Sequence, residues 1–167
     1  MPLTTDGAWK AIEDAIFGVI AFTNGQGKPR TAGVVYVVDG RSLLIASDKE
    51  AWKVRHIVAR PDVSMTVTVP KRIPFLPFVK IPAATITFRG VAEVLPVADV
   101  EESVIARLLR GLELDRDVVE DTRVIRVVPH GEFVTYGIAM PTIRMRNTAE
   151  ARGRAPCGTE REESPVG

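Results

Sequence analysis

The chain has 167 residues, of which 46% are hydrophobic and 26% charged, a composition typical of one globular domain with a full core. Its 22 basic and 21 acidic residues leave a net charge of +1, so no general attraction to nucleic acid is expected. The N-terminal sequence lacks the apolar segment of a secretory signal, and no apolar run approaches the ~20 residues of a membrane span. With Cys157 as its single cysteine the chain forms no internal disulfide, and these totals together predict a cytoplasmic protein without transmembrane segments.

The spacing of apolar residues predicts three helices among seven short antiparallel strands. Asp6, Ser47 and Asp99 are the predicted helix caps, and Ser47 forms a capping box with Glu50. Asp39-Gly40 predicts a type I′ hairpin turn, because both central residues of that turn need positive φ. Such strands favour a mainly β (α+β) split barrel of about six to seven strands with flanking helices, since closure removes exposed edges. The predicted strands span residues 17–23, 30–38, 42–46, 63–69, 84–95, 123–128 and 132–138, with a bulge or bend at Gly90.

The helix predicted after Ser47 has two opposed faces, and the basic one suggests an anion site. Arg30 lies at the head of a strand, and amides and the helix dipole at a helix N-terminus favour a phosphate. The simpler interpretation is a solvated basic face, the usual fate of helix charges. The apolar face holds Ala51, Val54, Ile57 and Val58, and the basic face holds Lys49, Lys53, His56 and Arg60.

The C-terminal part of the chain differs in composition from the rest. From Pro141 onward it is polar and rich in arginine, then acidic, which predicts a barrel domain over residues 1–140 and a polar, partly disordered tail over 141–167. In such a tail Cys157 is expected to be an inert, exposed thiol. His56 and His130 have no second ligand at metal spacing, so both are interpreted as surface histidines and no metal site is predicted.

Several segments, in their order and spacing, resemble the flavin-binding split barrels related to pyridoxamine 5′-phosphate oxidase, over about Asp6 to Ile138. The resemblance implies a homodimer with two flavin mononucleotide (FMN) molecules at the subunit interface. The segments that carry it are Gly25–Arg30, Asp39-Gly40, Leu44–Ser47, the Lys53–Pro61 helix and the Phe88–Ala92 strand.

The resemblance also implies roles for particular residues. Arg30 and Lys53 match the positions that hold the cofactor phosphate, and Ser47 matches one that presents a hydroxyl to the flavin. The strand that lies along the flavin ring matches residues 34–36, and Lys49 adds a more peripheral charge. The candidate cofactor-binding residues are Arg30, Val34, Val35, Tyr36, Ser47, Lys49 and Lys53.

Two departures from that family pattern bear on the substrate. Ala51 and Trp52 replace a Ser-Arg pair that precedes the lysine, and a C-terminal Arg-x-His signature is missing. The sequence therefore predicts an FMN-dependent oxidoreductase of a small-molecule redox substrate other than pyridoxamine phosphate. The alternatives are an F420-binding reductase and a non-catalytic flavin- or haem-binding protein. The apolar, proline-rich segment 70–82 is expected to be a lid over the flavin, a dimer contact or a membrane contact.

Overall fold

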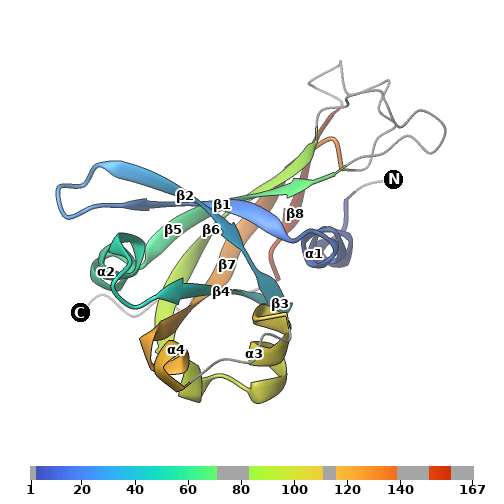
Figure 1. The fold of residues 1–167 in the computed structure, drawn as a ribbon. Helices are drawn as coiled ribbons and strands as arrows, with labels where there is room; N and C mark the ends of the chain where they lie inside the picture. The colour runs from blue at the N-terminus through green and yellow to red at the C-terminus, as the bar shows by residue number, and fades with distance from the viewer. Residues whose placement is uncertain (1–2, 71–82, 111–115, 139–150, 159–167) are drawn as a thin grey trace, which may run out of the picture.

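The computed structural model describes residues 3–70, 83–110, 116–138 and 151–158, and all its strands belong to one antiparallel sheet (Figure 1). The strands are β1 (Phe17–Thr23), β2 (Pro29–Val35), β3 (Val37–Asp39), β4 (Ser42–Asp48), β5 (Asp62–Val69), β6 (Ala84–Pro96), β7 (Thr122–Tyr136) and β8 (Arg152–Pro156). The helices are α1 (Thr5–Asp14), α2 (Trp52–Ala59), α3 (Glu102–Leu108) and α4 (Arg116–Asp121), with a 3-10 turn, η1, at Val97–Asp99. None of these helices combines the length and apolarity needed to cross a membrane.

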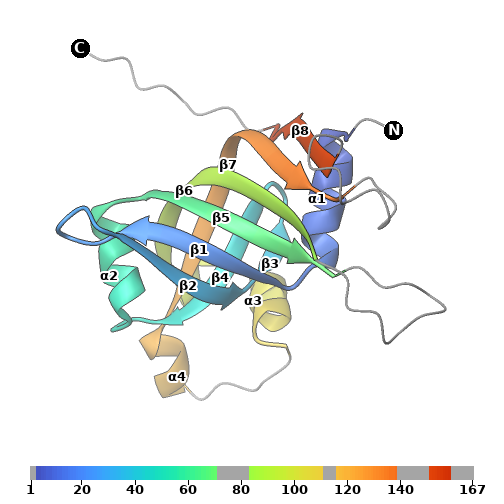
Figure 2. The ribbon, with the colours of Figure 1, turned by 90° about the horizontal axis from the view of Figure 1, so that it is seen from above.

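The sheet closes on itself through one run of chain. Its neighbours follow the order β2-β1-β5-β6-β7-β4-β3, with β8 added beside β7. The strands at its two ends, β2 and β3, are consecutive in the sequence and are separated only by Tyr36. The sheet must therefore curl until its ends meet, as Figure 2 shows from above. This confirms the predicted mainly β split barrel, with the strand expected at 30–38 divided at Tyr36.

The barrel interior is built from side chains that alternate inward along each strand. Phe133 lies at its centre and is fully buried, with the rings of Trp9 and Phe88 edge-on at 5.3 and 5.4 Å between centroids. Trp9 comes from α1, so the first helix completes this aromatic core. A second, smaller cluster joins α3 to the outer side of β4 and β7 through Leu44, Val100, Val104, Leu108 and Val124.

The predicted helix caps are wrong. Thr4 caps α1, its hydroxyl accepting the Gly7 N–H at 3.0 Å, because it lies at the first extended position before the helix. Ser47 instead continues β4, paired with Arg123 of β7, and α2 begins only at Trp52 without a side-chain cap.

The other two caps fail for related reasons. Asp48 Oδ1 accepts the Glu50 N–H at 2.7 Å, so an aspartate-centred turn takes the place of the predicted capping box. Asp99 lies in η1, and α3 begins at Glu102 without a side-chain cap.

Two turns and one bend also differ from the prediction. The turn between β3 and β4 is Gly40-Arg41, flanked by the paired Asp39 and Ser42, and of these two turn residues only Gly40 has positive φ (58°), which excludes type I′. Residues 129–131 do not separate two strands but continue β7 as one strand. The irregular pairing lies after Thr87, opposite residues 131–133, so β7 and not Gly90 supplies the extra residues.

The segment after residue 150 contributes to the core. β8 pairs with β7, and Cys157 behind it is fully buried, so the expectation of an exposed thiol is wrong. Trp9 Nε1 donates to the Cys157 carbonyl at 2.8 Å, and Thr5 Oγ1 donates to the Pro156 carbonyl at 2.9 Å. The domain boundary at residue 140 stays a prediction. The segments predicted as a lid, 70–82, and as a disordered end lie almost wholly outside the described residues.

Candidate functional site

The candidate cofactor site lies where the two ends of the sheet diverge. Next to β3 the strands β2 and β4 are close, but β3 pairs with β4 only at residues 42–44. Away from that point the ribbons of β2 and β4 separate, and α2 follows β4 (Figure 1). In the described part of the chain β2 pairs with β1 alone, so alternate main-chain N–H and C=O groups along its other edge have no strand partner there.

Arg30 and Lys53 lie on two elements, β2 and α2, that Phe22 of β1 links. Arg30 is the register partner of Phe22, and partners in an antiparallel pair project from the same face of the sheet. The buried Phe22 ring contacts the Trp52 ring at 5.2 Å between centroids, and Trp52 precedes Lys53 in the first turn of α2. Among the described residues neither Arg30 nor Lys53 has an acidic ion-pair partner.

Lys49 is placed differently, because Asp121 already engages it. Its ammonium group forms an ion pair with the Asp121 carboxylate, and its main-chain N–H donates to the Asp121 carbonyl at 2.7 Å. The side-chain hydrogen bond and the charge of Asp121 both raise the pKa of Lys49. A phosphate would have to compete with this carboxylate for Lys49, which leaves Arg30 and Lys53 as the stronger pair.

The remaining predicted positions differ in what they expose. Val34 and Tyr36 are core residues, 6% and 3% exposed, so only their main chain can meet a ligand. Tyr36 donates its hydroxyl to the Ile12 carbonyl at 2.7 Å, and burial raises its pKa above the ordinary value. Val35 projects outward and is 46% exposed. Ser47 is buried, with its hydroxyl 3.4 Å from the Asp48 carbonyl.

Trp52 is a further candidate contact, although the sequence favoured packing in the core or at an interface over contact with the flavin ring for this residue. It is 44% exposed although Phe22 and His56 hold its ring on two sides, His56 edge-on at 6.2 Å. At the other end of α2, Arg60 donates to the Gly25 carbonyl at 3.1 Å and ties the helix to the β1–β2 loop. Trp52 therefore presents a fixed aromatic surface beside Lys53.

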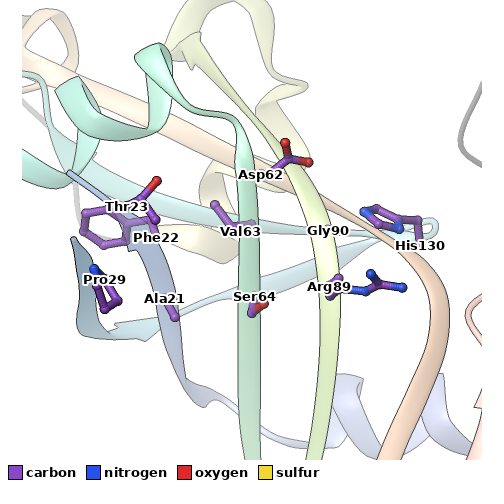
Figure 3. A pocket seen from close by; sticks show the side chains of 10 residues that line it. All are labelled: Ala21, Phe22, Thr23, Pro29, Asp62, Val63, Ser64, Arg89, Gly90 and His130. Carbon is purple, nitrogen blue, oxygen red and sulfur yellow. The ribbon is translucent and has the colours of Figure 1, made fainter. Parts of the chain in front are cut away.

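A groove lies elsewhere, on the outer face of the sheet (Figure 3). It has a volume of about 420 Å³, and none of the seven candidate cofactor-binding residues lines it. Its lining residues are Ala21, Phe22, Thr23, Pro29, Asp62, Val63, Ser64, Arg89, Gly90 and His130.

The curled antiparallel sheet with its flanking helices defines a split-barrel protein, and Arg30 and Lys53 stay candidate residues for an anionic ligand. The chain belongs to the pyridoxamine 5′-phosphate oxidase family, whose N-terminal family model matches residues 5–135. No curated protein sequence matches the chain.

Solved structures with the same fold have several cofactors in their names. An F420 reductase shares 22% identity at a TM-score of 0.55, over 74% of this chain and 93% of its own. The haem storage protein HutZ from Vibrio cholerae shares 19% at a TM-score of 0.60, over 82% of this chain and 96% of its own. A haem binding protein from Mycobacterium smegmatis shares 17% at a TM-score of 0.68, over 94% of this chain and 59% of its own. At these identities the likeness shows the fold, not the ligand.

Proposed function

We propose that the protein is an FMN-dependent oxidoreductase acting on a small-molecule redox substrate. The observation that carries the proposal is a pair of cations, Arg30 on β2 and Lys53 on α2, that have no acidic ion-pair partners among the described residues. A phosphate monoester carries up to two negative charges and accepts several hydrogen bonds, which fits one guanidinium and one ammonium group.

The surroundings of this pair fit the rest of a flavin. The Trp52 ring offers an exposed aromatic surface, and the unpaired edge of β2 offers main-chain donors and acceptors for the polar edge of a ring system. Val35 adds an apolar side chain on the same strand. In this arrangement the chain binds and orients the cofactor, and bound flavin supplies the hydride transfer.

Binding of FMN and riboflavin to matched variants tests the proposal. Arg30→Gln and Lys53→Gln should each weaken FMN binding by ~10- to 100-fold, the loss expected for one charge-assisted hydrogen bond. Riboflavin lacks the phosphate, so its weaker binding should change little. Arg55→Gln is the control, because it removes an exposed charge from the same helix. Lys49→Gln should have a smaller effect, because Asp121 holds that ammonium group.

Two results would contradict the phosphate site. Equal losses for both ligands would mean that Arg30 and Lys53 stabilise the fold. No loss for either ligand would favour the simpler interpretation, in which the basic side of α2 is a solvated surface. NADH or NADPH oxidation by the flavin-loaded protein then separates an enzyme from a carrier.

The second candidate cofactor is F420, which the name of one structural neighbour favours. Absorption spectra of the purified protein distinguish the cofactors: flavin gives two visible bands, F420 one near-violet band and haem a Soret band. A Soret band would favour the binding-protein alternative, consistent with the names of the two haem-related neighbours.

We also propose that the protein acts as a homodimer. Ile16, Phe17 and Val35 are 57%, 44% and 46% exposed, and Phe17 and Val35 are register partners on the outer face of the sheet. Clustered exposed apolar residues are typical of an interface. Phe17→Asp should shift the protein to monomers in sedimentation equilibrium, whereas Val58→Asp, on the exposed side of α2, should not. A wild-type monomer at micromolar concentration would refute this proposal.

A further inference from the structure

The Phe88–Ala92 strand contains none of the candidate cofactor-binding residues, but its Arg89 and Gly90 line the groove on the outer face of the sheet. Four register pairs align one row of side chains across five neighbouring strands: Thr31 with Ala21, Ala21 with Ser64, Ser64 with Arg89, and Arg89 with His130. Register partners share a face, so the whole row lies on the outside of the barrel. Figure 3 shows Ala21, Ser64, Arg89 and His130 in this order from β1 to β7.

The order of side-chain sizes in this row produces the groove. Ala21 and Ser64 in its middle are small, whereas Arg89 and His130 at one end are long or bulky. The space above the small pair measures about 420 Å³, which lies within the range of pockets for small organic ligands. Pro29 and Thr23 border the opposite end.

Arg89 is the charge that this groove presents. Its guanidinium reaches across to β7, where one nitrogen lies 3.7 Å from the position that a Cβ on Gly131 would occupy. Gly131 has φ of 76°, so the backbone there already favours glycine and leaves that space to Arg89. Among the described residues Arg89 has no acidic ion-pair partner.

The other charged side chains nearby leave Arg89 as the main positive charge at its end of the groove. Arg89 also lines a second groove of about 360 Å³, in which Arg154 and Glu132 neutralise each other at 2.9 Å. Asp62 lines the first groove on β5, next to the small Ser64, and is the register partner of Val91 rather than of Arg89. A negative group on a ligand is therefore attracted to the Arg89 end of the groove.

We infer that the groove binds a small, flat organic anion, an aromatic phosphate or carboxylate. Its charged group contacts Arg89, with His130 beside it, and its ring lies over Ala21 and Ser64. Arg89 suits this task because a guanidinium forms paired hydrogen bonds with phosphate and carboxylate oxygens. The inference does not depend on which cofactor occupies the Arg30 and Lys53 site.

Phenyl phosphate is the probe, titrated into the ¹⁵N-labelled full chain and followed by amide chemical shifts. The amides of Ser64, Arg89 and Gly90 should shift together and saturate. Inorganic phosphate should bind more weakly and benzyl alcohol should cause no saturating shift. Arg89→Gln should weaken phenyl phosphate binding by about tenfold or more, the effect of one charge-assisted hydrogen bond.

Three further variants test whether the groove itself holds the probe. Lys10→Gln removes one positive charge from exposed α1 and should leave binding unchanged. Asp62→Asn removes a negative charge from the groove and should strengthen binding. Ser64→Leu should fill the floor and abolish binding, with thermal unfolding as the check on folding.

The same titration also shows which results would overturn the inference. Shifts confined to residues around Arg30 and Lys53 would overturn the inference and leave the proposed cofactor site intact. Equal weakening by Lys10→Gln and Arg89→Gln would show a non-specific charge effect and also overturn it. Persistence of the groove shifts in the Lys53→Gln variant would support the inference whatever the fate of the flavin proposal.

Discussion

The thiol of Cys157 predicts a specific loss of stability at alkaline pH. The residue is 0% exposed, and burial, with a smaller contribution from the charge of Glu132, raises the pKa of its thiol from 9.0 to about 11. A raised pKa in the folded state means that the unfolded chain releases this proton first. The stabilisation is therefore complete below pH 9 and is lost as pH rises from 9 through 11. The full difference corresponds to about 3 kcal/mol of unfolding free energy, of which about 2 kcal/mol is lost by pH 11.

Urea unfolding of the wild type and of Cys157→Ala, from pH 7.5 to 11, measures the contribution of the Cys157 thiol to the unfolding free energy. Trp9 donates to the Cys157 carbonyl and provides the fluorescence signal. Lysines and tyrosines titrate in both proteins and cancel in the difference. Cys157→Ala should be the less stable protein at pH 7.5, since it leaves a small cavity, and the wild type should lose about 2 kcal/mol more than the variant by pH 11. If the difference in unfolding free energy between the two proteins stays constant from pH 7.5 to 11, the reasoning is refuted.

Two further changes test the packing of the fold. Gly90→Ala should lower the unfolding free energy by about 1–3 kcal/mol, because the new Cβ would lie 2.9 Å from both Val127 Cγ1 and the Val128 carbonyl oxygen. An unchanged urea midpoint would show that β7 shifts to make room for the added methyl group. Thr4→Ala should cost about 1 kcal/mol through loss of the α1 cap, and Asp6→Ala should cost less. A larger loss of stability for Asp6→Ala than for Thr4→Ala would indicate that Asp6 caps α1.

Regular alternation of side chains made most of the sheet predictable. β1 has the predicted bounds, Phe17–Thr23, and β5 differs from its prediction by one residue, because buried and solvent-facing residues alternate without interruption in both. β8 carries no such signal, since Arg152 to Pro156 contains one apolar residue besides proline, and its place is decided by pairing with β7. Long-range pairing of this kind leaves little trace in a local pattern.

Short-range signals failed where tertiary pairing competed with them. Ser47 has the sequence of a helix cap, but pairing with Arg123 keeps it in β4. Pro129 suggested a strand end, yet it lies in a part of β7 that pairs with β6 alone, after the last β4 pair and before the first β8 pair. A missing N–H costs little there.

Of the candidate site, the sequence located Arg30 on a strand and Lys53 on a helix, but it placed Lys53 about one turn inside a helix that in fact begins at Trp52. It did not show that Asp121, 72 positions after Lys49, engages that lysine, because an ion pair across such a separation has no periodicity. The sequence did not predict the outer groove either. Its members come from five strands and meet only through the register of the sheet.

The contacts between α1 and the segment behind β8 also constrain when the protein can fold. Thr5 and Pro156 are 151 positions apart, and Trp9 and Cys157 are 148 apart. Contacts of such high sequence separation form late, because a long loop must close before they stabilise anything. During synthesis the aromatic core around Phe133 therefore remains open at one side until Cys157 has left the ribosome. Until then, the nascent barrel exposes apolar surface of the kind that chaperones bind.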